Sequence, residues 1–115
     1  MAVSKDVSAI SLVYTTVPSE DVGRSIAEAL VRRRIAACAN MIPGMRAIYQ
    51  WKGKVEEEGE CVLILKTQSG RVGELRAALA QLHPYEVPAI IELPAKANDA
   101  FAAWIKEETE TKAGE

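Results

Sequence analysis

The sequence predicts an α+β domain whose elements follow the order strand, helix, long hairpin, helix, strand, helix. Residues 8–17 form a nearly continuous run of β-branched and apolar residues. Residues 36–67 contain two strand-forming stretches around Lys52-Gly53, and the segments on either side of the hairpin show helical periodicity. This order is the βαββαβ arrangement of ferredoxin-like folds with one C-terminal helix added. We therefore expect an antiparallel sheet with both main helices on one face.

The length of 115 residues suits one domain covering residues 1–115, with an ordered core at about 8–107 and a polar C-terminal tail. A net charge of −2 gives no electrostatic basis for binding nucleic acid or an anionic membrane. No apolar run approaches about 18 residues, and Met1–Asp6 is too polar for a secretory signal. We expect a cytoplasmic protein.

The first strand, Ser8–Val17, ends at Pro18-Ser19, where Ser19 is a favourable N-cap. The first helix then continues to the basic run Arg32-Arg33-Arg34. Its apolar stripe comprises Val22, Ile26, Ala27 and Leu30. Cations at a helix C-terminus complement the helix dipole, and no aromatic residue is interleaved with them, so we favour this interpretation over nucleic-acid binding.

The hairpin Ala36–Thr67 organises the prediction. A glycine at position 53 supplies the positive φ that two-residue hairpin turns need, which places Trp51 opposite Lys54. Each arm then has roughly 15 residues and a length of about 50 Å. Pro43-Gly44 should form a bulge that divides the first arm into two segments. So long a ribbon should project and pair with copies of itself in a closed oligomer.

After the hairpin, Ser69-Gly70 should cap a second helix that ends at His83-Pro84, followed by a strand at Pro88–Leu93. Asn98 should cap a third helix. The apolar residues of these helices are Val72, Leu75, Leu79 and Leu82, then Phe101, Trp104 and Ile105. One sheet face is left without a cover, and three copies closing around an axis would bury it.

The two cysteines, Cys38 and Cys61, should lie about 20 Å apart along the ribbon. That separation excludes an intrachain disulfide and a shared metal. We interpret both thiols as small apolar residues of a reduced protein.

The run from His83 to Pro88 gathers the single histidine, Tyr85 and Glu86 between two prolines. A lone histidine at a helix end is either a structural hydrogen-bonding group or a ligand, and the sequence leaves both open. No HxH, CxxC or HExxH pattern is present, so spacing specifies no metal site within one chain.

The hairpin brings Tyr49 and Trp51 to one face, with Lys54 and Lys66 on the returning arm. A binding interpretation makes the aromatics pocket walls and Lys66 an anion anchor. The alternative is a hairpin contact between subunits that involves Tyr49, Trp51 and Lys54. The acidic run Glu56-Glu57-Glu58 with Glu60 should solvate the hairpin, or attract cations loosely. No pattern indicates a nucleophile with its base, so no enzyme is predicted.

Several motifs together resemble the CutA family of divalent-cation tolerance proteins. They are VYTTVPSED, RRRIAACANMIPGMRAIYQWKGKVEEEGECVLILKT, HPYEVPAIIELP and the helix containing Trp104. The resemblance covers about Ile10 to Lys106. It implies a ferredoxin-like protomer in a tight homotrimer similar to the PII signalling proteins, and a role in tolerance to copper and other divalent metals.

The resemblance also implies a Cu(II) site that uses His83, with Glu86 and Tyr85 as neighbouring oxygen donors. A cysteine and a second histidine associated with metal binding in the family are replaced here by Thr15 and Leu82. The remaining nitrogen and oxygen donors suit Cu(II) or Zn(II) better than Cu(I). The metal is not expected to be essential for folding.

The leading hypothesis is a non-enzymatic homotrimer that contains binding clefts between its subunits. The clefts would bind a divalent metal or a small anionic ligand and are lined by Trp51, Lys66, His83, Tyr85 and Glu86. The alternative is a structural or PII-like signalling trimer with an unidentified protein partner and no metal role. An enzyme with a nucleophile and base assembled across the interface is the least supported class, because each chain has one histidine.

Overall fold

The computed structural model describes residues 6–110, and its elements follow the predicted order. Four antiparallel strands form one sheet in the order β2-β3-β1-β4. The elements are β1 (Ala9–Val17), α1 (Glu20–Arg32), β2 (Cys38–Trp51), β3 (Lys54–Thr67), a 3-10 turn (Ser69–Arg71), α2 (Val72–Leu82), β4 (Ile91–Lys96) and α3 (Asp99–Glu108). The α+β prediction of a ferredoxin-like sandwich with an added helix is confirmed.

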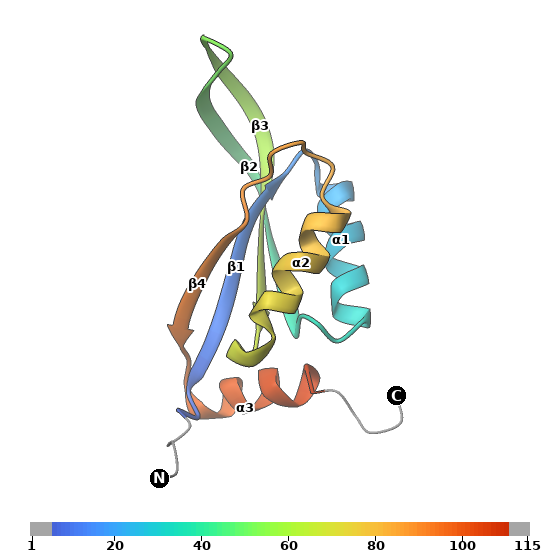
Figure 1. Ribbon diagram of the computed structural model, residues 1–115, viewed down its shortest axis with the longest axis vertical. Helices are drawn as coiled ribbons and strands as arrows, with labels where there is room; N and C mark the ends of the chain where they lie inside the picture. The colour runs from blue at the N-terminus through green and yellow to red at the C-terminus, as the bar shows by residue number, and fades with distance from the viewer. Residues whose placement is uncertain (1–5, 111–115) are drawn as a thin grey trace.

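Helices α1 and α2 cover one face of the sheet, and α3 lies across its lower end (Figure 1). The main core lies between this face and the two helices, where side chains such as Leu30, Leu63 and Leu79 are fully buried. A smaller cluster packs Ala102 and Ile105 of α3 against the start of β1. The added helix therefore closes one end of the core, because its apolar face has no other surface to cover.

The start of α1 agrees with the sequence prediction, whereas the start of α2 does not. The Ser19 hydroxyl accepts a hydrogen bond from the Val22 N–H at 3.2 Å, as an N-cap should. Ser69-Gly70 instead lies in the 3-10 turn, and Arg71 precedes α2 without a side-chain cap. The Arg71 guanidinium donates to the Arg34 and Thr109 carbonyls at 2.8 and 2.7 Å. It thereby joins the ends of α1 and α3 to α2.

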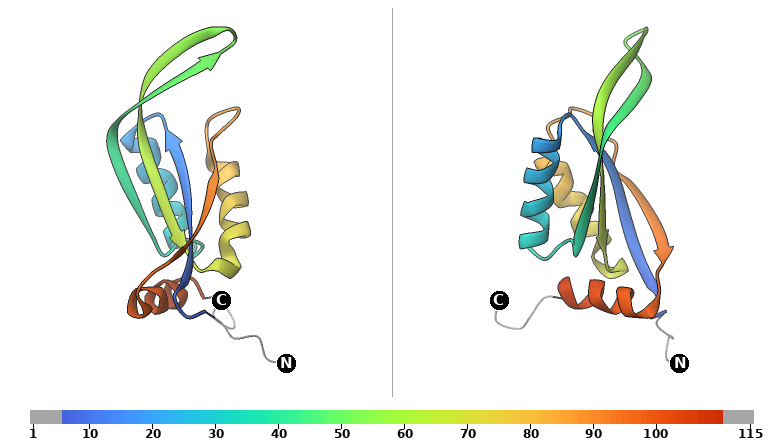
Figure 2. Two further views of the ribbon diagram at one scale, coloured as in Figure 1. Left: turned by 90° about the vertical axis from the view of Figure 1, so that its left-hand side faces the viewer. Right: turned by 180° about the vertical axis from the view of Figure 1, so that it is seen from behind.

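The hairpin has the predicted turn and register. Trp51 is opposite Lys54, and both turn residues have positive φ, 50° at Lys52 and 82° at Gly53. This combination matches the right-handed twist of the strands. The predicted bulge is present between Ile42 and Met45. The expected division of the first arm is wrong, since β2 continues through the bulge as one strand (Figure 2).

Two boundaries near the C-terminus differ from prediction. The fourth strand starts at Ile91 and runs through Pro94 to Lys96, three residues later at each end than the predicted Pro88–Leu93. A proline is compatible with β4 because this edge strand pairs only with β1, leaving its outer side free of ladder bonds. The polar tail begins later than expected, since α3 continues to Glu108 and Thr109 is fully buried. Residues 111–115 lie outside the described part.

Among residues 6–110, no helix lies over the second face of the sheet (Figures 1 and 2). Leu12 and Tyr14 alternate along β1 with the core residues Val13 and Thr15, so they point to this side. Their partners on β4 are Leu93 and Ile91, which are 45% and 48% exposed. We call this apolar surface the open face.

Both cysteines are free in the structure, as predicted. Cys61 is buried, and Cys38 is opposite Lys66 at the far end of the ribbon. Burial raises the pKa of the Cys38 thiol, while the charge of Lys66 opposes that rise. The two thiols therefore lie in different environments and do not interact with each other.

Leu63 on the central strand β3 provides a test of the core. Leu63→Ala should lower the free energy of unfolding by about 2–4 kcal/mol, because a fully buried side chain leaves a cavity. Val55→Ala, at a site 72% exposed on the hairpin, should change it by less than about 0.5 kcal/mol. Urea unfolding at matched protein concentration measures both. Equal losses in the two variants would contradict the assigned core.

Candidate functional site

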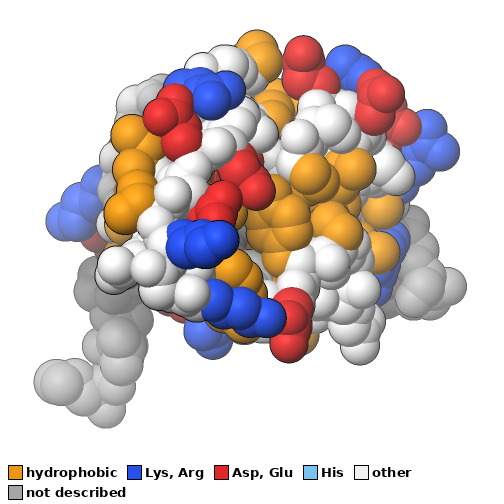
Figure 3. Space-filling view, turned by 90° about the horizontal axis from the view of Figure 1, so that it is seen from above, with side chains coloured by type: hydrophobic (Ala, Val, Ile, Leu, Met, Phe, Trp, Pro, Cys, Tyr) orange, Lys and Arg blue, Asp and Glu red, His pale blue; other side chains and the backbone are white. Residues whose placement is uncertain are grey.

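A groove with a volume of about 760 Å³ lies between the projecting hairpin and the loop that joins α2 to β4. Viewed from the hairpin end, acidic side chains border a hydrophobic surface (Figure 3). The lining residues are Thr16, Ala47, Tyr49, Trp51, Glu56, Glu58, Glu60, Pro84, Tyr85, Glu86, Val87 and Ala89. The structure therefore brings together four of the predicted residues: Tyr49, Trp51, Tyr85 and Glu86.

The hairpin register decides which acidic residues join the aromatics. Tyr49 pairs with Glu56, and Ala47 pairs with Glu58, so these residues share one face of the ribbon. Glu57 points to the other face, where it forms an ion pair with Arg46 at 3.2 Å. The acidic run, expected from the sequence to solvate the hairpin or attract cations loosely, is thus divided between two faces. Alternation along β3, read against the predicted register, was the signal that separates its two faces.

On the loop side, Tyr85 connects the loop to the hairpin. Its hydroxyl donates a hydrogen bond to Glu60 Oε1 at 2.8 Å. Burial raises the pKa of the Tyr85 phenol, and the hydrogen bond and charge of Glu60 raise it further. Desolvation likewise raises the pKa of Tyr49, with added effects from Glu58 and Glu56. Both phenols therefore lie in a negative electrostatic environment.

His83 lies behind the groove and is buried. Its Nδ1 atom accepts the Tyr85 backbone N–H at 3.2 Å, which places the ring proton on Nε2. Nε2 lies 2.8 Å from the Thr16 carbonyl oxygen and 3.1 Å from Thr15 Oγ1. Both ring nitrogens are thus engaged within the chain. The sequence left open whether His83 is a structural hydrogen-bonding group or a ligand. These contacts support the structural role.

The residues present in one chain do not fit a copper site centred on His83. A metal-binding imidazole must offer a free nitrogen lone pair, and Nδ1 already accepts a hydrogen bond. Glu86 is exposed on the loop, and Thr15 supplies a hydroxyl in contact with the ring. Within residues 6–110 no group of three histidine, cysteine or acidic side chains is arranged to hold a metal ion.

The two lysines expected near the site lie elsewhere in the chain. Lys54 is next to the hairpin turn, opposite Trp51, and does not line the groove. Lys66 is twelve residues further along β3, a separation of about 40 Å in an extended strand. Its Nζ atom lies 5.4 Å from the centre of the Phe101 ring. Lys66 could join a cleft with Trp51 only across a subunit boundary.

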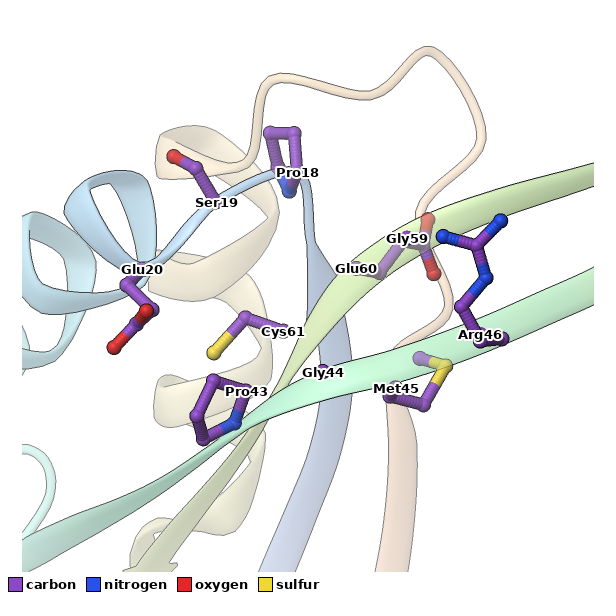
Figure 4. A pocket seen from close by; sticks show the side chains of 10 residues that line it. All are labelled: Pro18, Ser19, Glu20, Pro43, Gly44, Met45, Arg46, Gly59, Glu60 and Cys61. Atoms are coloured by element: carbon purple, nitrogen blue, oxygen red, sulfur yellow. The ribbon is translucent and has the colours of Figure 1, made fainter.

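A smaller pocket of about 310 Å³ lies between the start of α1 and the β2 bulge (Figure 4). Its lining includes Ser19, Glu20, Arg46, Glu60 and Cys61. The Ser19 hydroxyl is used by the helix cap, and the Cys61 thiol lies 3.6 Å from the Val62 carbonyl oxygen. These groups already have partners, so the larger groove is the better candidate site.

The family is decided by comparison with known proteins. The family model described as "CutA1 divalent ion tolerance protein" matches residues 11–108. The chain belongs to the CutA family. The "Divalent-cation tolerance protein CutA" of Thermus thermophilus is 46% identical over 99 residues, covering 85% of this chain and 96% of that protein. Human "Protein CutA" is 42% identical over 103 residues, covering 89% of this chain and 58% of its own length.

The solved structure of a CutA1 from Ehrlichia chaffeensis, described as a divalent ion tolerance protein, supports the same conclusion. It aligns with a TM-score of 0.86 at 34% identity, over 92% of this chain and all of that one. The CutA family therefore accounts for the fold as well as the sequence motifs. No helix among the described residues is long and apolar enough to cross a membrane.

Tyr85 gives the site a testable pH dependence. Because its pKa is raised in the folded protein, unfolding above about pH 10 releases a proton that the folded state retains. Its contribution to stability is therefore complete below about pH 10 and declines as pH rises further. Tyr85→Phe removes this dependence together with the hydrogen bond to Glu60.

The free energy of unfolding in urea should be measured for the wild type and Tyr85→Phe at about pH 8 and about pH 11. The wild type should be the more stable at the lower pH, and this difference should shrink at the higher pH. Both proteins are measured at the same concentration, so that any association between chains affects their stabilities equally. A stability difference that stays constant across this range would contradict the raised pKa.

Proposed function

We propose that this CutA chain forms a non-enzymatic homotrimer that contributes to divalent-cation tolerance by binding a divalent cation or a small ligand in clefts at subunit boundaries. The observation that supports it most directly is the groove between the hairpin and the 84–89 loop, whose lining includes Thr16, on the same side of β1 as Leu12 and Tyr14 of the open face. A ligand site at the rim of an association surface is a common arrangement in proteins.

The open face supports association with further copies. Leu12, Tyr14, Ile91 and Leu93 form an apolar surface that none of the described helices covers, and Ile42 on β2 is 50% exposed. Large contiguous apolar surfaces on soluble chains are usually interfaces. Closed rotational symmetry would bury three such faces together and leave no strand edge for open-ended growth.

The proposal of a non-enzymatic role is supported by the environment of His83. A general base needs a ring nitrogen that can reach a nucleophile or substrate. Here both nitrogens are within 3.2 Å of protein atoms, and the ring is buried beneath the loop. The family names describe tolerance to ions, in keeping with a binding role.

The geometry of His83 also favours a second candidate, a structural or PII-like signalling trimer with no metal role. In that case the histidine fixes the loop, and the trimer acts as a scaffold or signals to a protein partner. The Cu(II) site at His83 and Glu86 stays a prediction, as do the cytoplasmic location and a protein partner. A copper titration separates the candidates.

Leu93→Glu should reduce the mass measured by light scattering from that of three chains, because it places a charge on the open face, opposite Leu12. Val7→Glu is the matched control, since Val7 is 69% exposed and lies outside the paired strands. Circular dichroism should show that both variants stay folded, and Ile91→Glu repeats the test at a neighbouring site. A folded Leu93→Glu protein of unchanged mass would contradict the assigned interface.

Calorimetric titration of Cu(II) tests the role of His83. Because both ring nitrogens are engaged, we expect wild type and His83→Ala of the same mass to give the same heats. If the alanine variant changes mass, His83→Gln retains an N–H for the Thr16 carbonyl. Saturable binding near one ion per chain that vanishes in the variant would establish the copper site and exclude the trimer without a metal role.

A further inference from the structure

We propose that the groove binds a small organic cation, a molecule that carries ammonium or guanidinium groups on an apolar frame. This inference rests on the proposed function, which places a ligand in this groove, and it names the chemical class of that ligand. Three features of the groove support it: aromatic walls, a lining whose charged residues are all acidic, and a size suited to an organic molecule.

The aromatic walls come from both sides. Tyr49 and Trp51 project from β2, and Tyr85 faces them from the loop. The faces of aromatic rings attract cations within about 6 Å, most strongly for tryptophan. Trp51 already shows this property at the hairpin turn, where Lys52 Nζ lies 5.9 Å from its ring centre. Ala47, Pro84, Val87 and Ala89 add apolar surface between the polar groups, against which an alkyl chain would be desolvated.

The charge of the groove has one sign. Glu56, Glu58, Glu60 and Glu86 line it, whereas no lysine or arginine stands among its lining residues, all of which the structure describes. The hydroxyl of Tyr85 donates to one oxygen of Glu60, and the Tyr49 phenol is hydrogen-bonded to Glu58, so no basic side chain of the lining neutralises these carboxylates. The raised pKa values of Tyr85 and Tyr49 follow partly from these carboxylates. A cation would be stabilised in this field and an anion repelled.

Size separates an organic cation from a bare metal ion. A volume of about 760 Å³ lies within the range of small-molecule sites, on the order of 300–1,000 Å³, and is far larger than one coordinated ion needs. Among residues 6–110, moreover, no three acidic, histidine or cysteine side chains converge as a metal shell requires. The groove can instead contact separate charges along an extended molecule. The small anionic ligand expected from the sequence depended on Lys66, which does not line this groove within one chain.

Trp51 offers a direct readout. The chain has two tryptophans, and Trp104 lies on α3 stacked against Phe101. In a Trp104→Phe background, fluorescence reports only on Trp51 in the groove. Titration with spermidine in the presence of EDTA should give a saturable change that weakens as salt is added. Tetraethylene glycol, an uncharged chain of similar length, should give no saturable change.

Charge variants test whether the groove carboxylates are responsible. In the same background, Glu56→Gln with Glu58→Gln should raise the half-saturating spermidine concentration by roughly fivefold. The matched control, Glu28→Gln with Glu107→Gln, removes the same charge from exposed helical sites and should leave it unchanged. Equal weakening by both pairs, or an equal response to the uncharged chain, would overturn the proposal. The proposal would also be overturned if spermidine caused no change in Trp51 fluorescence. That result is expected if a neighbouring copy of the chain fills the groove.

Two further controls distinguish failure of the organic-cation proposal from failure of the proposed trimer. EDTA removes divalent metal from the spermidine titration, and light scattering of the same sample reports the oligomeric mass. If the protein has the mass of a trimer and Trp51 fluorescence does not change, only the organic-cation proposal is overturned. A protein of single-chain mass that binds spermidine overturns the trimer and retains the ligand class.

Discussion

The register of the β2–β3 hairpin is the constraint on which the rest of the structure depends. A two-residue turn with positive φ at Lys52 and Gly53 fixes Trp51 opposite Lys54, and every pair back to Met45 and Glu60 follows. Since side chains alternate, a shift by one residue would turn Tyr49 and Trp51 away from the groove and replace Glu58 with Glu57. Two residues at the turn thus determine both the aromatic wall and the charge that faces it.

The bulge at Pro43-Gly44 allows one ribbon to have two different roles. The bulge adds one residue to β2 and shifts its pairing with β3, so Ala39 and Met41 below it pack against the core, whereas Ala47 and Tyr49 above it line the groove on the other side. The upper half projects past the helices, where no core exists to bury its side chains. A positive φ of 81° at Gly44 accommodates the distortion at a residue without a Cβ. The groove therefore lies where the ribbon leaves the core.

Most of the fold could be predicted from the sequence because its signals are local. The Ser19 cap, the Gly53 turn, the bulge and the helical stripes each depend on neighbours within a few residues. The errors arose where distant contacts dominate. The start of α2 is fixed by Arg71 bonding to the Arg34 and Thr109 carbonyls, and β4 starts late because its register follows β1. No local pattern contains those partners.

The site residues, like the fold, were predictable only where they do not depend on contacts between distant parts of the chain. Tyr49, Trp51, Tyr85 and Glu86 were predicted from residue type and meet in the groove, whereas Lys66 and Lys54 do not reach it. The engagement of His83 by Thr15, Thr16 and Tyr85 depends on the packing of α2 against β1, which spacing alone does not specify. A histidine that fixes the loop holds Tyr85 at Glu60, and this contact closes the groove against the hairpin. The family motif at residues 83–86 thus has a structural reason that requires no metal.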